Sequence, residues 1–361
     1  MEVSPLSEGF SVQSIFRTYS VAFDRDFPAA LRGALRDGDV VLVDRQVRDL
    51  FPGALEGLPG TVRVLALDAT EEQKSYENLV WILEDLIEQG FRKNHRLVAI
   101  GGGIVQDATA FIASILYRGV DWLFFPTTLL AQCDSCIGSK TSINFRAYKN
   151  QVGNFYPPAE IHICEAFLDT LPELAIRSGI GEMAHYFLVS GEADYRLFGA
   201  ALDRCRADRD EMRRLIRRSL EIKKSYIERD EFDRGPRQVF NYGHSFGHAL
   251  ESVTHYAIPH GVAVSFGMDI ANFISSRLGL IPSSLRDEIR GLLARIWAGS
   301  SVDGVDVRAF EQALGKDKKN VGNELRVILT RGLGAMFKSP LALDAKVSGW
   351  LDEWFRDWRK P

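Results

Sequence analysis

The chain has 361 residues and a formal net charge of −4, with 46% hydrophobic and 25% charged side chains. These fractions are typical of a folded globular protein, and the lack of a broad basic surface argues against a nucleic-acid partner. No apolar run is long enough to span a bilayer, and the first residues lack the basic and apolar regions of a secretory signal. Four cysteines in so long a chain suggest reduced thiols. We therefore expect a cytoplasmic protein without a membrane or nucleic-acid partner.

The first half of the chain alternates short apolar runs with amphipathic segments. Buried strands are predicted over 40–43, 62–67, 96–100 and 122–125, and helices over 71–89 and 108–117. Strands separated by helices indicate parallel βαβ units with right-handed crossovers. The pattern predicts an α/β, Rossmann-like parallel-sheet domain over residues 1–172, with ligands bound beyond the carboxyl ends of its strands.

Three glycines, Gly101–Gly103, follow directly after the predicted strand 96–100. Glycines at this place let the backbone approach a pyrophosphate, and the first amides of a following helix favour the anion. The stretch is not the GxGxxG fingerprint, because Gln106 and Asp107 follow where a third glycine would be expected. A tight turn without a ligand explains the glycines nearly as well.

A polar loop follows the predicted strand 122–125. Thr127–Thr128 could cap a helix, and then Asp134, Lys140, Lys149 and Asn150 stand among small residues. Such a loop suits phosphate and hydroxyl groups, although a solvated polar loop is the common alternative.

Cys133 and Cys136 have the spacing of a redox pair or of half a zinc site. No second CxxC exists in the chain. We interpret both as ordinary buried thiols.

The second half of the chain has a helical pattern. Helices are predicted over 174–189, 194–207, 209–228, 239–253, 262–278 and 284–298, and one strand over 325–329. A run of helices after alternating units indicates a second, all-α domain over residues 173–361. The helix 209–228 is strongly basic, and we expect most of a group of six of its charges to face solvent: Arg213, Arg214, Arg217, Arg218, Lys223 and Lys224.

Residues 237–260 hold four of the seven histidines. His244 and His248 stand four apart in a predicted helix, so both project from one face. His260 follows, and Glu182 offers a carboxylate upstream. Two imidazoles and one carboxylate are the usual protein ligands of a catalytic zinc ion. From spacing alone, hydrogen-bonded core histidines are an equal alternative.

Taken together, these segments resemble the 3-dehydroquinate synthase family of sugar phosphate cyclases, over about residues 40–335. The resemblance rests on GGGIVQD (101–107), YRG (117–119), PTTLLAQCDSCIGSKTSIN (126–144), KNQVGNFYPP (149–158), FLDTLP (167–172), NYGHSFGHALE (241–251), PHG (259–261) and DKKN (317–320). It implies an N-terminal NAD-binding domain and a C-terminal metal-binding domain, in a homodimer. It also implies a carbon–oxygen lyase that oxidises a seven-carbon sugar phosphate transiently, eliminates phosphate, reduces the product again and closes a carbocycle, as in the shikimate pathway of aromatic amino acid biosynthesis.

The resemblance carries roles to individual positions. It implies that Glu182, His244 and His260 bind Zn²⁺ or Co²⁺, and that His248 lies in the active site without being a ligand. NAD contacts are implied for Asp44, Glu71, Lys74, Gly102, Gly103, Asp107, Thr127, Thr128, Lys140, Lys149, Phe167 and Thr170. Catalytic and substrate-binding roles are implied for Arg118, Asp134, Lys140, Asn150, His185, Lys223, Arg237, Asn241, His248, Lys318 and Lys319. Among these, Arg118 matches an arginine that reaches into the site of the neighbouring subunit.

Lys223 and Arg237 match the pair that holds the substrate carboxylate in the family. They stand 21 and 7 residues before His244. A buried lysine and a forked guanidinium suit a carboxylate that leaves water. We therefore predict a carboxylated substrate such as 3-deoxy-D-arabino-heptulosonate 7-phosphate. The alternatives are a cyclase of sedoheptulose 7-phosphate or an amino analogue, a metal-dependent polyol dehydrogenase that releases NADH, and a non-catalytic binding protein.

Three positions depart from the family pattern. His185 replaces the lysine of Glu-x-x-Lys, so it could approach the metal or act as a titratable acid or base. Gln106 replaces a glycine beside the pyrophosphate, which would alter the fit of NAD. Cys133 and Cys136 flank Asp134 with no effect that the sequence predicts.

Overall fold

The computed structural model describes residues 9–146, 148–315 and 324–359. The chain forms two compact units: 1–171 with 212–216 and 223–231 make the first, and 172–211, 217–222 and 232–361 make the second. Helix α7 (Arg209–Ile227) contributes residues to both units. The sequence places one boundary after residue 172, whereas contacts divide the chain after residue 171 and return two further stretches to the first unit. No described helix is long and apolar enough to cross a membrane.

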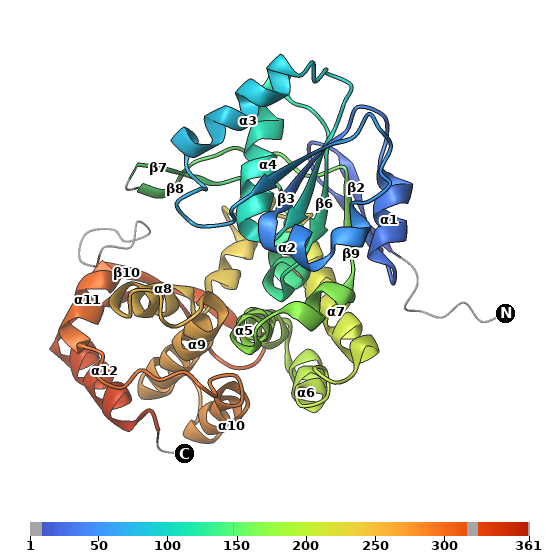
Figure 1. The fold of residues 1–361 in the computed structure, drawn as a ribbon. Helices are drawn as coiled ribbons and strands as arrows, with labels where there is room; N and C mark the ends of the chain where they lie inside the picture. Colours follow the sequence, from blue (N-terminus) through green and yellow to red (C-terminus); the bar gives the residue numbers. More distant parts are fainter. Residues whose placement is uncertain (1–8, 147, 316–323, 360–361) are drawn as a thin grey trace. The chain divides into compact units, whose positions relative to one another are not determined.

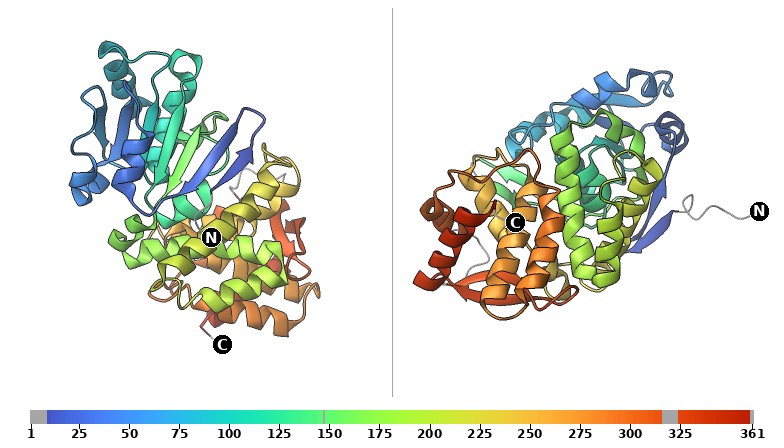
Figure 2. Two further views of the ribbon diagram at one scale, coloured as in Figure 1. Left: turned by 90° about the vertical axis from the view of Figure 1, so that its right-hand side faces the viewer. Right: turned by 90° about the horizontal axis from the view of Figure 1, so that it is seen from below.

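The first unit is built on a seven-stranded sheet with the order β1-β2-β9-β6-β5-β3-β4 (Figure 1). Neighbouring strands run parallel, apart from the antiparallel pair of β1 and β2 at one edge (Figure 2). The strands are β1 (Phe10–Gln13), β2 (Thr18–Phe23), β3 (Val40–Asp44), β4 (Arg63–Leu67), β5 (Leu97–Gly101), β6 (Trp122–Pro126) and β9 (Glu160–Ile163). The four predicted strands correspond to β3, β4, β5 and β6, which confirms the Rossmann-like class.

Helices cover both faces of this sheet, with α3 and α4 on one side and α1 and α2 on the other (Figure 1). Alternate strand residues such as Val41 and Val43 pack with Phe27 and Leu31 of α1 in one apolar core, as the two-residue period of a strand requires. The helices and turns are α1 (Phe27–Ala34), α2 (Arg45–Leu50), η1 (Pro52–Ala54), α3 (Tyr76–Glu88), α4 (Gly103–Ile115), η2 (Leu116–Arg118), η3 (Ala131–Ser135) and η4 (Glu165–Thr170), with a small hairpin of β7 (Ile143–Phe145) and β8 (Tyr148–Val152).

Two helix boundaries in this unit differ from the predicted ones. The helix predicted over 71–89 begins only at Tyr76, because the hydroxyl of Ser75 accepts the N–H of Asn78 and caps the first turn. The helix predicted over 108–117 begins earlier, at Gly103, since it starts directly from the glycine turn after β5.

The second unit is mostly helical, with one two-stranded antiparallel sheet (Figure 2). Its central helix α9 is buried continuously from Gly261 to Asn272, against α5, α8 and α10. Its elements are α5 (Glu173–Ser190), α6 (Glu192–Ala201), η5 (Pro236–Asn241), α8 (His244–Val253), α9 (His260–Arg277), α10 (Ser283–Ala294), α11 (Val307–Gly315), β10 (Glu324–Thr330), β11 (Met336–Ala342) and α12 (Ala345–Asp357).

One expectation for the helical half is wrong, and another holds only in part. The helix predicted over 239–253 is interrupted: η5 ends at Asn241, and Gly243 adopts a left-handed conformation (φ 80°) before α8 begins. The basic residues of α7 are not all at the surface, because Arg214 is exposed whereas Arg213 and Lys223 are buried. Arg213 forms a two-point ion pair with Glu165, at 2.7 and 2.6 Å.

Candidate active site

Three helices of the second unit, α5, α8 and α9, approach closely because glycines stand at their crossings. A Cβ atom at Gly181 of α5 would lie 2.1 Å from the carbonyl oxygen of Gly261 on α9, and one at Gly261 would lie 1.8 Å from the carbonyl oxygen of Ser178. Only glycine permits backbones to come this near. The residues beside these two glycines, Glu182 and His260, are thereby brought together.

Glu182, His244 and His260 converge at this crossing. The Nε2 atoms of His244 and His260 lie 3.4 and 3.5 Å from Oε1 and Oε2 of Glu182. Glu182 is 3% exposed, and its Oε2 has no hydrogen-bond partner among the described residues. Burial alone would raise the pKa of Glu182, but the imidazoles of His244 and His185 hold it below its ordinary value. A buried carboxylate facing two imidazole nitrogens is a donor set that fits a divalent cation.

The other ring nitrogen of His244 and of His260, Nδ1, also contacts an oxygen atom. Nδ1 of His260 lies 3.1 Å from Oε2 of Glu251, and Nδ1 of His244 lies 3.3 Å from the carbonyl oxygen of Tyr242. Such contacts orient metal-ligating histidines. Sequence reasoning did not identify Glu251. Its position seven residues after His244 and three after His248, on one helical face, is the signal that would have found it.

The two other histidines with predicted roles, His185 and His248, border the same cluster. Nδ1 of His185 lies 3.5 Å from Oε1 of Glu182, and the side chain is 1% exposed. The ring of His248 stacks on that of His260 at a centroid distance of 5.5 Å. With Glu251 and His260, His248 forms a second group whose donor atoms are near enough to share one cation.

Arg237 and Asn241 stand on η5, directly before α8. Arg237 is 7% exposed, and Nδ2 of Asn241 donates to the carbonyl oxygen of Gln238 at 3.0 Å. Asn241 also lines a small cavity of about 190 Å³, together with Asp233, Gln238, Arg326, Ile328 and Lys338. No sequence motif pointed to the two basic residues of this cavity, which come from β10 and β11.

In the first unit, the glycine turn joins the carboxyl end of β5 to α4. The N–H of Thr127 donates to the carbonyl oxygen of Gly101 at 3.0 Å, and a Cβ atom at Gly102 would lie 2.9 Å from Cγ2 of Thr128. The N–H of Ala131 donates to the hydroxyl of Thr128 at 3.2 Å. The predicted Gly102, Gly103, Thr127 and Thr128 therefore lie together at the edge where ligands of parallel sheets bind.

Three polar side chains, two of them far from Lys74 in the sequence, meet around its ammonium group. It donates to Oδ2 of Asp107 at 3.1 Å and to Oδ1 of Asn150 at 2.9 Å, and lies 3.9 Å from Oε1 of Glu71. Burial raises the pKa of Asp107 to about 6, although Lys74 opposes the shift. Asn144, which was not predicted, connects the group by donating to Glu71 and accepting the N–H of Asn150, each at 2.9 Å.

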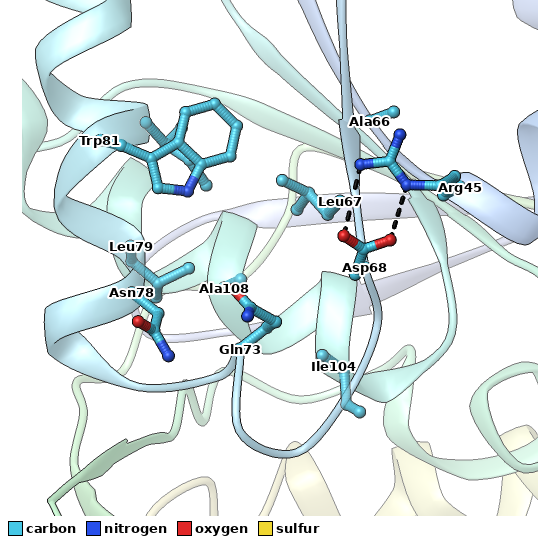
Figure 3. Close-up of a pocket in the computed structure, with 11 residues that line it drawn as sticks. Arg45, Ala66, Leu67, Asp68, Gln73, Asn78, Leu79, Trp81, Ile104 and Ala108 are labelled. Carbon is cyan, nitrogen blue, oxygen red and sulfur yellow. Dashed lines mark hydrogen bonds and ion pairs between the residues drawn. The ribbon is translucent and has the colours of Figure 1, made fainter.

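A cavity of about 270 Å³ opens beyond the carboxyl end of β4 (Figure 3). At one side Arg45 forms a two-point ion pair with Asp68, at 2.6 and 3.3 Å, and Trp81 of α3 lies at the other (Figure 3). Asp44 ends the adjacent β3, and its carboxylate caps α2 by accepting the N–H of Gln46 at 3.0 Å. Burial raises the pKa of Asp44 above its ordinary value. The cavity is lined by Arg45, Ala66, Leu67, Asp68, Gln73, Asn78, Leu79, Trp81, Ile82, Ile104 and Ala108.

Phe167 and Thr170, two further predicted NAD contacts, lie on η4. The ring of Phe167 is 1% exposed and packs on Phe27 and Phe51, at centroid distances of 4.5 and 5.2 Å. The hydroxyl of Thr170 donates to the carbonyl oxygen of Phe167 at 3.0 Å. Because its ring belongs to the core, a nucleotide contact by Phe167 would use its backbone.

Arg118 stands in a strained turn after α4. Tyr117 (φ 49°) and Arg118 (φ 62°) both adopt the left-handed conformation that non-glycine residues disfavour. Lys93 holds the turn by donating to the carbonyl oxygens of Tyr117 and Gly119. The side chain of Arg118 is exposed. Backbone strain of this kind is typical of functional positions.

Lys140 and Lys149 are exposed, and Lys149 lies on β8. Lys140 pairs with Phe155 through an isolated bridge. Lys318 and Lys319, which were predicted to contact substrate, lie outside the described residues.

Lys223 of α7 meets Asp134 of η3 within the first unit. Its ammonium group donates to the backbone carbonyl oxygen of Asp134 at 2.6 Å and to its Oδ1 at 2.7 Å. The flanking Cys133 and Cys136 are buried free thiols, as we interpreted them, and burial raises the pKa of Cys136 to about 12.

Comparison with protein families matches two consecutive segments of the chain. The model described as 3-dehydroquinate synthase N-terminal matches residues 64–178, and the one described as 3-dehydroquinate synthase C-terminal matches residues 179–320. The 3-dehydroquinate synthase of Sulfurovum sp. (strain NBC37-1) is 38% identical over 274 residues, which cover 76% of this chain and 77% of that protein. The 3-dehydroquinate synthase of Cereibacter sphaeroides (strain ATCC 17029 / ATH 2.4.9) is 39% identical over 315 residues, covering 82% and 83%.

Several solved structures share the fold. A 2-deoxy-scyllo-inosose synthase complexed with carbaglucose-6-phosphate, NAD⁺ and Co²⁺ has a TM-score of 0.86 at 23% identity, covering 97% of this chain and 100% of that one. The 2-epi-5-epi-valiolone synthase ValA of Streptomyces hygroscopicus subsp. jinggangensis 5008, with NAD⁺ and Zn²⁺ bound, has a TM-score of 0.81 at 24% identity, covering 98% and 99%. The glycerol dehydrogenase of Schizosaccharomyces pombe has a TM-score of 0.61 at 16% identity, covering 97% and 91%.

Proposed function

Because this chain belongs to the 3-dehydroquinate synthase family, we propose that it converts a carboxylated heptulosonate 7-phosphate, such as 3-deoxy-D-arabino-heptulosonate 7-phosphate, to 3-dehydroquinate with release of phosphate. The observation that carries this proposal is 34–39% identity to curated 3-dehydroquinate synthases over 75–84% of the chain. The chain is thus a carbon–oxygen lyase acting on a phosphate ester. Four free cysteines support placing it in a reducing cytoplasm.

Glu182, His244 and His260 are assigned as ligands of Zn²⁺ or Co²⁺. Two observations support the fit: the unsatisfied Oε2 of buried Glu182, and the two imidazole nitrogens within 3.5 Å of its oxygens. When bound, the ion would polarise the hydroxyl to be oxidised and then the ketone. Glu251 would hold the proton on Nδ1 of His260, so that Nε2 presents its lone pair.

The first unit is assigned to NAD⁺, which when bound would accept a hydride and return it within each turnover. The exposed amides at the start of α4 suit the pyrophosphate, and no side chain at Gly102 or Gly103 blocks approach. Asp44 and Glu71 are carboxylates suited to ribose hydroxyls. Lys74, Asp107, Thr127, Thr128, Lys140, Lys149, Phe167 and Thr170 keep their proposed NAD contacts.

Basic side chains are assigned to the two anionic groups of the substrate, its carboxylate and its phosphate. Lys223 and Arg237 bind its carboxylate, since a neutral polyol would need neither cation. Lys140 and Asn150 hold phosphate or hydroxyl oxygens, and Lys318 and Lys319 are assigned the same role. Asp134, Asn241 and His248 orient the reacting carbons. Phosphate loss needs a proton removed beside the new ketone, and the substrate's own phosphate can accept it, so no side chain is assigned as that base.

A coupled assay tests the reaction. Purified protein with NAD⁺, Zn²⁺ and the heptulosonate phosphate is expected to release phosphate without net NADH. The His260→Ala variant should lose bound metal and turnover together. Net NADH formation with a polyol, and no phosphate release, would instead identify a dehydrogenase and reject the cyclase.

The homodimer proposal has its own test, because Arg118 would act in the partner's site. Neither Arg118→Ala nor His260→Ala should be active alone. Mixed by co-refolding or co-expression, they should regain activity, since one site of each heterodimer would combine an intact metal centre with an intact Arg118. No recovery in verified heterodimers would place Arg118 outside the partner's site.

A second candidate substrate class comes from His185. It stands 3.5 Å from Glu182 in place of the family lysine that contacts substrate hydroxyls. A cyclase of an amino or uncarboxylated sugar phosphate would accommodate that change. Phosphate release from sedoheptulose 7-phosphate, with none from the carboxylated sugar, would favour this class.

A further inference from the structure

Both ends of the side-chain amide of Gln106 form hydrogen bonds within the protein. Gln106 lies in the second turn of α4 and is 7% exposed. Its Nε2 donates to the carbonyl oxygen of Ser135 at 2.6 Å, and its Oε1 accepts the hydroxyl of Ser135 at 2.6 Å. Because a carbonyl oxygen can only accept, this pair fixes which end of the amide faces the backbone. Both ends of Gln106 therefore bond to one residue.

Ser135 is the last residue of η3, a single π-helical turn. The N–H of Cys136 donates to the carbonyl oxygen of Ala131 at 3.0 Å, which is the five-residue spacing of such a turn. A helix leaves its final carbonyl groups without partners inside the helix, and Gln106 supplies the donor for that of Ser135. Isolated π turns are rare and occur often at functional sites.

The residue before Ser135 is Asp134, which holds Lys223 through two oxygens. An ammonium group has three hydrogens, so two are donated to Asp134 and, as far as the described residues go, one is left to meet a ligand. Lys223 is 6% exposed, and its direction depends on where η3 stands.

We propose that Gln106 is a positioning residue that fixes η3 through Ser135, so that Asp134 aims Lys223 at the substrate carboxylate. The inference rests on the proposed function, in which Lys223 binds that carboxylate. It replaces the expectation that Gln106 acts on the fit of NAD. The two roles differ in what they change: positioning affects the sugar phosphate, whereas a pyrophosphate contact affects the nucleotide.

Gln106→Met and Ser135→Ala, alone and combined, separate these roles. Methionine fills a similar volume without an amide. Gln106→Met removes both hydrogen bonds and should lower kcat/KM for the heptulosonate phosphate about 10-fold or more, since a misplacement of about 1 Å can cost still more. Ser135→Ala keeps the bond from Nε2 to the backbone carbonyl oxygen and should lower kcat/KM by a smaller factor. The dissociation constant for NAD⁺, measured by titration without substrate, should stay within about 2-fold. The double variant should be little worse than Gln106→Met, because that change already removes both hydrogen bonds.

Thr109→Val is the matched control. Thr109 lies one turn further along α4, is fully buried, and its hydroxyl makes no hydrogen bond within the described residues. This variant should keep both kcat/KM and the NAD⁺ affinity. It shows how far kcat/KM and the affinity for NAD⁺ change when a buried side chain on the same helix is replaced by one of similar volume.

The Lys223→Met variant separates two proposals: that Lys223 binds the substrate carboxylate, and that Gln106 positions Lys223. A KM for the carboxylated substrate that is unchanged in Lys223→Met would refute the carboxylate role and with it the inference. A raised KM in Lys223→Met with wild-type behaviour of Gln106→Met and Ser135→Ala would refute the inference alone. A weakened affinity for NAD⁺ with unchanged substrate KM would assign Gln106 to the nucleotide site. If Gln106→Met does not fold, Ser135→Ala, which removes only the hydroxyl bond, should still lower kcat/KM with unchanged affinity for NAD⁺, and wild-type kinetics of Ser135→Ala would refute the inference.

Discussion

Replacing Gly261 by alanine should destroy the proposed metal centre without changing any of its proposed ligands. The added Cβ would lie 1.8 Å from the carbonyl oxygen of Ser178, whereas real Cβ contacts essentially never fall below 3.0 Å, so α9 must move from α5 by about 1.2 Å. His260 precedes Gly261 and moves with it, away from Glu182. Metal–ligand distances tolerate changes of only about 0.2 Å. We therefore expect zinc affinity to fall about 100-fold or more, above the usual effect of changing an outer contact.

Two other helical glycines of the second unit provide a graded comparison. A Cβ at Gly247 of α8 would meet its nearest atom, Cα of Val264, at 2.9 Å, so Gly247→Ala should cost far less than Gly261→Ala. Gly291 of α10 has no atom within 4 Å of that position, so Gly291→Ala should stabilise the protein by about 0.4–1 kcal/mol with unchanged zinc affinity.

The assay is competition for zinc against a chromophoric chelator, with the unfolding of metal-free protein measured in parallel. Overpacking should lower the free energy of unfolding of Gly261→Ala by about 1–3 kcal/mol. Folded Gly261→Ala protein that binds zinc as tightly as the wild type would refute the reasoning, because the glycine contact would then not position His260. If that variant does not fold, Gly247→Ala should still show a smaller loss of affinity.

Three further outcomes follow from single contacts. Glu251→Gln should weaken zinc binding about 10- to 100-fold by disturbing His260, and unchanged chelator competition would dismiss that contact. Glu165→Gln removes the carboxylate that forms the two-point ion pair with buried Arg213 and should lower the free energy of unfolding by about 3 kcal/mol in denaturant titrations. Breaking the exposed ion pair of Glu192 and Arg196 on α6 should lower it by less than about 1 kcal/mol. The pKa of Asp107 is about 6 in the folded protein, above its ordinary value of 3.8. Its protonation therefore stabilises the folded state fully below about pH 3.8, and this stabilisation is lost as the pH rises through 6. The free energy of unfolding of the wild type should thus fall by about 1–3 kcal/mol relative to that of Asp107→Asn between about pH 3.8 and pH 7. If the free energies of unfolding of the two proteins changed with pH in parallel, the raised pKa of Asp107 would be contradicted.

The sequence predicted the central strands well because they are short, mainly apolar runs such as 97–100. It missed β1, β2 and β9, whose alternating exposed residues resemble loops until a neighbouring strand pairs with them. The break before α8 was also missed. Gly243 interrupts an otherwise helical pattern, and only the left-handed φ that the crossing with α9 imposes ends the turn there.

Sequence motifs predicted individual site residues, but they could not predict which of these residues would contact one another. Nothing local indicates that Gln106 would meet Ser135, or that Lys223 would be buried against Asp134, since each pair is joined only by folding. The same holds for Asn144, whose amide links Glu71 to Asn150. Periodicity could have revealed Glu251, because it shares a helical face with two histidines.

Substrate choice is the most direct measurement of the proposed reaction. Phosphate release would be followed from 3-deoxy-D-arabino-heptulosonate 7-phosphate and from sedoheptulose 7-phosphate, with NAD⁺ and Zn²⁺ present and product masses read in parallel. If Lys223 and Arg237 bind the carboxylate as proposed, each contact is worth about 1.5–3 kcal/mol. The proposal therefore predicts a kcat/KM at least about 100-fold higher for the carboxylated sugar, with 3-dehydroquinate as product. Equal or reversed preference would contradict the assignment of Lys223 and Arg237 to the carboxylate.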